Sequence, residues 1–322
     1  MKKSAIRTLA FLLCIYMCAV SAYGAQYLIP VGKVIGLELS DNTVTVAAFD
    51  DILGTKAKAA GLCAGDTIVA IDGVPITCAE DVRQALNRSK GTIQLKLQRR
   101  GTAQTLQLTP EITKDGPKLG VFLKEGVTGI GTVTFYDPNT GSFGALGHGV
   151  NTADGSILRL SSGRAYAANV ASVCKGKAGH PGQLRGALCG KQPIATLTRN
   201  TNHGLFGKAT EVWTGQAMQT AACTEVQTGA ATILSTIEGD TVQEYSVEIC
   251  KIYPKTKSGD KNMLIRITDP KLLETTGGIV QGMSGSPIIQ DGKLVGAVTH
   301  VLVNDPTRGY GIFIENMLDA AE

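Results

Sequence analysis

The sequence has few charged and few aromatic side chains. Of its 322 residues, 18% are Asp, Glu, Lys or Arg and 5% are Phe, Trp or Tyr. The basic residues are dispersed and the net charge is only +4, so the clustered basic face typical of nucleic-acid binding is missing, and we expect no nucleic-acid partner. The 39 glycines and the short Val, Ile and Thr runs instead favour β-structure with many turns.

Motifs for metals and cofactors are also missing. There is no Cys-x-x-Cys pair and no phosphate-binding loop, and the four histidines show no metal-ligand spacing, so we expect no metal and no cofactor. Six cysteines follow the N-terminal segment, and their even number permits disulfides, although free thiols are equally compatible with the sequence. These are Cys63, Cys78, Cys174, Cys189, Cys223 and Cys250.

Residues 1–25 have the features of a targeting segment. Three basic residues precede an apolar run from Leu9 to Val20, and small residues follow at 22–24. The run is shorter than the roughly 20 residues that a spanning helix needs. We therefore predict a signal peptide, with an uncleaved N-terminal membrane segment as the alternative, and export across the cytoplasmic membrane.

Residues 27–110 contain a compact β-α-β pattern. An apolar strand opens after Gly65-Asp66 and turns at Asp72-Gly73, an amphipathic helix follows at 79–86, and an alternating strand follows at 92–99. The run from Ala60 to Gly73 resembles that of PDZ domains. The resemblance implies that an extended peptide adds to a strand and that a glycine-containing loop binds its terminal carboxylate.

The candidate for this PDZ loop is Gly36, Leu37, Glu38 and Leu39, where Glu38 would disfavour an acidic ligand. A PDZ fold that serves only as a packing or regulatory module is the alternative. Residues 111–117 are polar and contain Pro and Gly, which is typical of a short linker. From 118 to 322, closely spaced glycines and short apolar runs predict an all-β domain of barrels or sandwiches, with a short helix at 314–321.

The run Gly282-Met-Ser-Gly-Ser-Pro287 has the composition of a nucleophile loop. Glycines allow a tight turn that exposes the Ser284 hydroxyl, and the backbone N–H groups of Gly282 and Ser284 are the expected oxyanion-hole donors. A hairpin with its turn at Asp291-Gly292 would hold the loop rigidly. Ser286 is the rival nucleophile, but the following proline restricts it to extended backbone. A simple surface turn is the alternative interpretation of the whole loop.

A base for this serine must come from few candidates. His148 lies between glycines, where a small-residue loop leaves the imidazole accessible, and it is the strongest candidate. His180 and His203 lie in turn-like sequences, and His300 is expected to be a structural strand histidine near the site.

Three segments together resemble the SpoIVB peptidase family, PDZ-containing serine peptidases of endospore-forming bacteria. They are Phe143–Val150, Thr275–Gln290 and Gly296–Val301. The resemblance implies a chymotrypsin-like all-β serine peptidase domain after the PDZ domain, with Ser284 as nucleophile, His148 as general base and Asp269 as the third catalytic residue. Because no aspartate occurs between residues 155 and 239, Asp240 and Glu211 remain open as alternatives for that third role.

The resemblance further implies a secreted serine endopeptidase that cleaves itself and a membrane-bound protein regulating an intramembrane protease. This would occur between forespore and mother cell, at the sigma-K checkpoint of sporulation. Gly278, six residues before the serine, argues against a pocket selecting Arg or Lys. Two other hypotheses remain: a non-catalytic extracytoplasmic regulator that binds peptide tails through its PDZ domain, and a general envelope quality-control protease.

Overall fold

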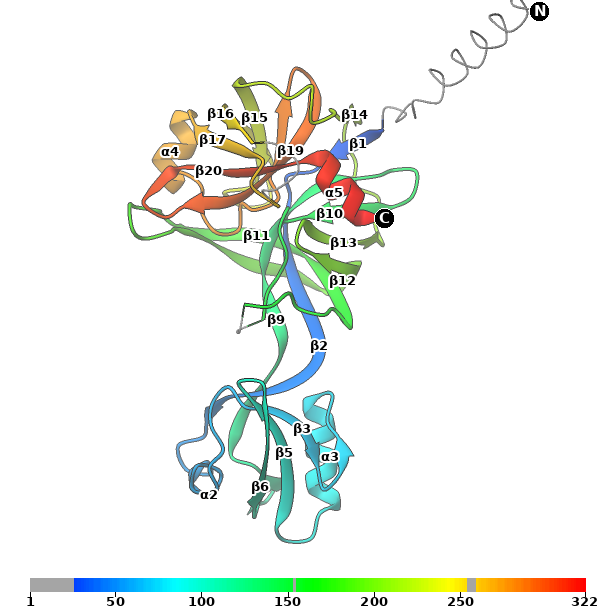
Figure 1. Ribbon diagram of the computed structural model, residues 1–322, viewed down its shortest axis with the longest axis vertical. Coiled ribbons are helices and arrows are strands. Elements are labelled where there is room, and N and C mark those ends of the chain that lie inside the picture. The colour runs from blue at the N-terminus through cyan, green and yellow to red at the C-terminus, as the bar shows by residue number, and fades with distance from the viewer. Residues whose placement is uncertain (1–25, 153–154, 254–258) are drawn as a thin grey trace, which may run out of the picture.

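The computed structural model describes residues 26–152, 155–253 and 259–322. The predicted signal peptide therefore lies outside the described residues. Two β-barrels pack side by side, and a pair of long strands connects them to a smaller unit (Figure 1). Within the described ranges, no helix is both long and apolar enough to cross a membrane, and no disulfide joins the six cysteines.

The first barrel is a ring of six antiparallel strands, which the pairing of β2 with β9 closes. Alternating side chains fill its core, as expected for strands with one buried face. A short strand, β1 (Tyr27–Pro30), pairs antiparallel with the end of β9 and also pairs with β14 (Met218–Gln219). The six strands are β2 (Val34–Phe49), β9 (Val121–Tyr136), β10 (Ser142–Ala145), β11 (Ser162–Cys174), β12 (Gln183–Thr201) and β13 (Gly204–Ala209).

The second barrel is also closed and six-stranded, with the order β15-β16-β17-β20-β19-β18. The predicted hairpin forms its β18–β19 pair, and Asp291 and Gly292 both adopt positive φ, as a tight two-residue turn requires. The strands are β15 (Gly229–Ser235), β16 (Gln243–Ile252), β17 (Met263–Ile267), β18 (Pro287–Gln290), β19 (Lys293–Leu302) and β20 (Asp305–Phe313).

Two helices belong to the second barrel. Helix α4 (Pro270–Thr276) precedes the Ser284 loop, and α5 (Ile314–Ala321) confirms the helix predicted at 314–321. Ile314 and Met317 of α5 are buried in a small core shared with strands of both barrels. The mostly β architecture, with two closed barrels in the peptidase domain, thus agrees with the predicted chymotrypsin-like class.

The PDZ unit is an insertion between β2 and β9, rather than a domain that precedes the barrels. Its own core gathers around α3, β3 and β5. The predicted domain limits 27–110 and 118–322 therefore need correction, because residues 27–39 pair with barrel strands and the predicted linker 111–117 lies largely in a small hairpin. The elements are α2 (Thr55–Ala59), β3 (Thr67–Ile71), β4 (Val74–Pro75), α3 (Ala79–Arg88), β5 (Ile93–Arg99), β6 (Thr102–Leu108), β7 (Glu111–Thr113) and β8 (Gly116–Lys118).

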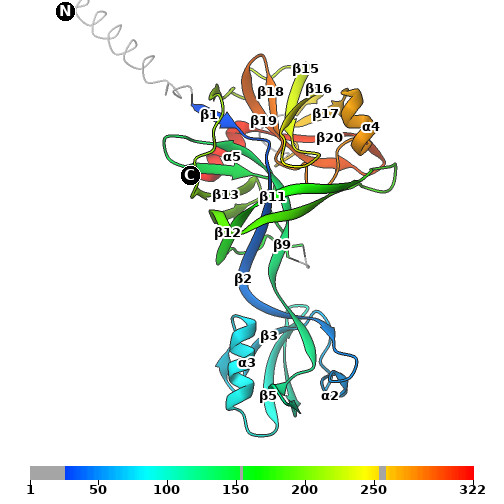
Figure 2. The same ribbon diagram turned by 180° about the vertical axis from the view of Figure 1, so that it is seen from behind.

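Strands β2 and β9 belong to both units and run side by side between them in both views (Figures 1 and 2). Their pairing shifts register between Leu39 and Val44, where the ribbon leaves the barrel. Gly126 has φ 62° there, and a Cβ at this position would lie 1.9 Å from the Leu39 carbonyl oxygen. Glycine is therefore required for the two strands to cross so closely.

Asp66 of the Gly-Asp motif stabilises the PDZ unit from inside. Its carboxylate is fully buried, accepts the Cys63 N–H at 2.8 Å and pairs with Arg99 at 2.6 Å. Burial acts to raise the pKa of Asp66, but the hydrogen bonds from Arg99 and Cys63 outweigh it and hold the pKa below its ordinary value. The motif thus closes the α2–β3 turn onto β5.

Candidate active site

The Ser284 loop belongs to the second barrel but is held by β9 of the first. Thr132 donates its N–H to the Ser284 carbonyl at 3.1 Å and its hydroxyl to the Gly282 carbonyl at 2.8 Å. Thr134, two residues further along the same face, donates its hydroxyl to the Gly285 carbonyl at 2.8 Å. Because both threonines are fully buried, these bonds are shielded from water and fix the loop against the other barrel.

Glycine is required at position 285 of this loop. Gly285 has φ 98°, and an added Cβ would lie 2.0 Å from the Thr132 carbonyl oxygen. Ser286 is fully buried, and its hydroxyl bonds to that of Ser235 at 3.0 Å. Ser284, in contrast, lines an open cavity. The structure therefore presents Ser284, and not Ser286, to a substrate.

Thr132 also holds the His148 loop, which follows β10. Leu146 donates its N–H to the Thr132 carbonyl at 3.2 Å and adopts φ 69°, a left-handed conformation that is uncommon for leucine. This turn aims His148 toward the second barrel. Its Nδ1 lies 2.9 Å from the Gly149 carbonyl oxygen, which can only accept a hydrogen bond. The neutral imidazole therefore carries its proton on Nδ1 and leaves Nε2 as the basic nitrogen.

Ser284 and His148 line one cavity of about 480 Å³ between the barrels. The Ser284 hydroxyl donates to the Thr299 carbonyl on β19 at 2.7 Å. Gly282 also lines this cavity, with φ 100°. In the part of the chain that the structure describes, the backbone N–H groups of Gly282 and Ser284 donate no hydrogen bond to another protein group. Two unused donors therefore flank the serine hydroxyl.

His300 is a site residue that the sequence interpretation placed nearby but assigned no role. Its ring centroid lies 5.0 Å from that of His148, and it lines the same cavity. Its Nδ1 lies 3.3 Å from an Asp260 carboxylate oxygen, yet it makes no aligned hydrogen bond. Burial lowers the pKa of His300 and the proximity of His148 lowers it further, while Asp260 partly opposes both effects. The sequence could have indicated this residue, because His300 lies in Gly296–Val301, the third segment that resembles the SpoIVB peptidase family.

Asp269 is not beside His148. It is the N-cap of α4, where its carboxylate accepts the Leu272 N–H at 2.9 Å, and it lines neither of the two cavities that His148 borders. The aspartate before Pro270 has the sequence pattern of a helix N-terminus, with proline in the first turn. The arrangement therefore corrects the expectation that Asp269 orients the imidazole. Asn202 and Asp260 line the smaller cavity beside His148 instead.

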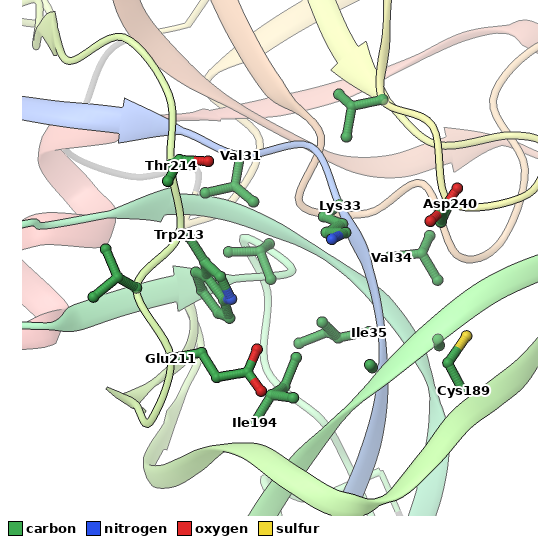
Figure 3. A pocket seen from close by; sticks show the side chains of 15 residues that line it. Val31, Lys33, Val34, Ile35, Cys189, Ile194, Glu211, Trp213, Thr214 and Asp240 are labelled. Carbon is green, nitrogen blue, oxygen red and sulfur yellow. The ribbon is translucent and has the colours of Figure 1, made fainter.

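The two alternatives for the third residue lie at another cavity (Figure 3). Glu211 and Asp240 line a space of about 440 Å³ together with Trp213 and Lys33. Figure 3 shows Glu211 beside Trp213, with Asp240 across the cavity. This cavity shares no lining residue with the one at Ser284. Neither acid therefore serves His148 in this structure.

The predicted PDZ loop is also corrected. Gly36, Leu37, Glu38 and Leu39 lie on β2 within the first barrel, paired on both sides with β9 and β11, so no peptide can add to them. The groove of the PDZ unit, about 330 Å³, lies instead between α3 and the segment Leu119–Leu123. Gly120 has φ 69° at its end. The run Leu119-Gly120-Val121-Phe122 could have indicated this groove, but the predicted domain limits place it in the peptidase domain.

Comparison with known proteins identifies both a peptidase domain and a PDZ domain. The model of the SpoIVB peptidase S55 family matches residues 115–318, and that of the PDZ domain matches residues 52–99. A candidate zinc metalloprotease of Rhizobium meliloti is 34% identical over 101 residues, which cover 31% of this chain and 26% of that protein. The chain thus spans about a quarter of the length of this curated relative.

Among solved structures, the PDZ domain of the SdrC-like protein from Listeria monocytogenes is 22% identical with a TM-score of 0.23, covering 27% of this chain and 92% of that one. The active form of the Rv3671c protease from M. tuberculosis is 15% identical with a TM-score of 0.37, covering 60% of this chain and 73% of that one. Because the family model matches residues 115–318, which make up more than half of the chain and include the second barrel and the Ser284 loop, the chain belongs to the SpoIVB peptidase S55 family.

Proposed function

We propose that this protein is a serine endopeptidase in which Ser284 is the nucleophile and His148 the general base. One observation carries the proposal: residues from two different barrels meet at one cavity, beside two backbone N–H groups that have no acceptor among the described residues. A merely structural glycine loop would not require a buried threonine to hold the serine and histidine turns together. Family membership supports the same reaction class.

The reaction begins when the Ser284 hydroxyl leaves the Thr299 carbonyl and turns toward His148. Nε2 of His148 takes the hydroxyl proton while Oγ bonds to the substrate carbonyl carbon, and the N–H groups of Gly282 and Ser284 bind the resulting oxyanion. As the intermediate collapses, the C–N bond breaks and Nε2 protonates the leaving amine. Water then repeats the sequence on the acyl-enzyme. The Gly149 carbonyl holds the Nδ1 proton, a task often performed by a carboxylate.

The biological role follows from family resemblance. The enzyme acts outside the cytoplasmic membrane, after export by residues 1–25, in the space between forespore and mother cell. It cleaves itself and a membrane-bound regulator of an intramembrane protease during sporulation, at the sigma-K checkpoint. The PDZ unit recruits peptide tails in the groove between α3 and Leu119–Leu123, where apolar side chains and a strand edge are available.

Labelling with a fluorophosphonate, followed by intact-mass measurement, tests the nucleophile and the base. We expect a single adduct on the wild type, none on Ser284→Ala, and at least a hundredfold slower labelling of His148→Ala. Ser286→Ala is the matched control and should be labelled, because its hydroxyl faces Ser235 in the core.

Labelling that survives Ser284→Ala would refute this nucleophile. A folded wild type that neither labels nor cleaves itself would favour the non-catalytic regulator. Indiscriminate cutting of unfolded proteins would favour the quality-control protease.

A further inference from the structure

The cavity at Ser284 is almost free of charge. Its walls come from β2, β9 and β19 and from the segment before the nucleophile, and they are mostly aliphatic. Among the residues that the structure describes (26–152, 155–253 and 259–322), no Asp, Glu, Lys or Arg lines it, and the two histidines are the only ionisable groups there. Among these, burial lowers the pKa of His300, which favours its neutral form.

Backbone geometry excludes a charged side chain at position 278, directly before the segment that lines this cavity. Gly278 has φ 131°, and an added Cβ would lie 2.1 Å from the Pro306 carbonyl oxygen, so position 278 cannot carry a carboxylate without rearrangement. Next to it, Ile279 donates its N–H to the same carbonyl at 2.8 Å. Ile279 and Val280 are 2% and 1% exposed and present a fixed apolar wall.

Another wall comes from β19 and the turn that follows it. Thr299, His300 and Val301 of the strand and Val303 of the turn all line the cavity. The Thr299 carbonyl, which the Ser284 hydroxyl occupies at rest, is an acceptor that a substrate backbone N–H can take when the serine turns away. A residue bound there would lie beside the cavity that Val301 and Ile279 line.

We propose that this cavity is the primary specificity pocket, that it selects a large uncharged aliphatic side chain on the acyl side of the scissile bond, and that Val303 at its mouth controls the exclusion of charge. This inference rests on the proposed peptidase function. An aliphatic side chain gains from leaving water, whereas a charged one would lose its hydration without gaining a partner. Val303 is 48% exposed, so a charge introduced there enters the mouth without being buried in the fold.

Amino-acid diphenyl phosphonates test the pocket, because their side chain occupies it while phosphorus bonds to the serine. We expect the leucine phosphonate to label the full chain about 100-fold faster than the lysine or aspartate analogue. Val303→Asp should improve the lysine analogue relative to the leucine analogue by roughly tenfold. Val212→Asp is the control: this exposed loop valine lies at the cavity of Figure 3 and should leave the ratio unchanged.

The outcomes separate the two proposals. A chain that plain fluorophosphonate does not label overturns the peptidase function and, with it, the pocket. A chain that plain fluorophosphonate labels on Ser284, but that reacts equally fast with all three analogues, overturns only the pocket. If the ratio of labelling rates for the lysine and leucine analogues is the same in Val303→Asp as in Val212→Asp, Val303 does not control the exclusion of charge.

Discussion

Replacing Thr132 with valine should uncouple the two halves of the site. Thr132 contacts the serine loop through its N–H and hydroxyl and the histidine loop through its carbonyl. Valine has nearly the same shape and keeps both backbone bonds, but it removes the only hydroxyl donor recorded for the Gly282 carbonyl in the described structure. The substitution therefore deletes one hydrogen bond without creating a large cavity.

The expected loss of stability follows from the burial of Thr132. Thr132 is 0% exposed, so the Gly282 carbonyl would lose a partner in a site that water reaches poorly. An unsatisfied buried acceptor costs about 1–3 kcal/mol, and we expect the free energy of unfolding to fall by that amount. Displacement of the loop by a fraction of an ångström to about 1 Å should slow the labelling of Ser284 by roughly tenfold to a hundredfold.

Urea unfolding and fluorophosphonate labelling rates measure the two effects separately. Thr132→Ser keeps the hydroxyl and loses only a methyl group, so it should retain most of the labelling rate. Thr134→Val removes the similar bond to the Gly285 carbonyl, further from the oxyanion donors, and should lose stability with a smaller loss of rate. If Thr132→Val matches the wild type in both assays, the hydrogen bond from the Thr132 hydroxyl does not position the serine.

Four further predictions test other parts of the molecule. Asp269→Ala should lower the free energy of unfolding by about 1 kcal/mol by uncapping α4. Asp269→Asn is also a good cap and should be labelled on Ser284 at a rate within a few-fold of the wild type. A folded Asn variant that is not labelled would show that the carboxylate charge is needed. Arg99→Leu should destabilise the PDZ unit by about 3 kcal/mol, measured by hydrogen exchange across residues 60–108, while Lys56→Leu at an exposed pair should change it little. Because the pKa of Asp66 is lowered on folding, its stabilisation is present above its ordinary value of 3.8 and should be lost as pH falls through the folded value. Phe122→Ser should weaken the binding of C-terminal peptides at least tenfold by fluorescence polarisation, with Val69→Ser as the exposed control outside the groove.

Local patterns explain which parts of the structure were predictable. The Asp291-Gly292 hairpin, the helix at 314–321 and the PDZ motif around Asp66 each depend on residues close in sequence. The exposure of Ser284 and the burial of Ser286 also followed from neighbouring glycines and proline. Such features are determined by short-range sterics, which a single sequence displays directly.

The errors in the domain limits and in the PDZ loop involve pairing across long stretches of chain. Leu37 pairs with Gly129, so β2 and β9 form one ribbon although the whole PDZ unit separates them in sequence. The motif near Gly36 and the motif near Gly120 each combine a glycine with apolar neighbours. Only the pairing decides that the first lies between two barrel strands and the second beside an open groove. The expectation for Asp269 differs from the structure for another reason, because a cap before proline and an orienting carboxylate look alike in sequence.

The insertion also explains why one strand serves both units. The first residues of β9, from Val121 to Leu123, form a wall of the PDZ groove, and Val127, Gly129 and Ile130 line the cavity at Ser284. Thr132 follows directly and bonds to both catalytic loops. Because peptide bonds connect these positions in an extended strand, each residue adds only about 3.3 Å. The length of β9 thus determines the separation between the peptide groove and Thr132. Two tandem domains joined by a flexible linker would have no such fixed separation.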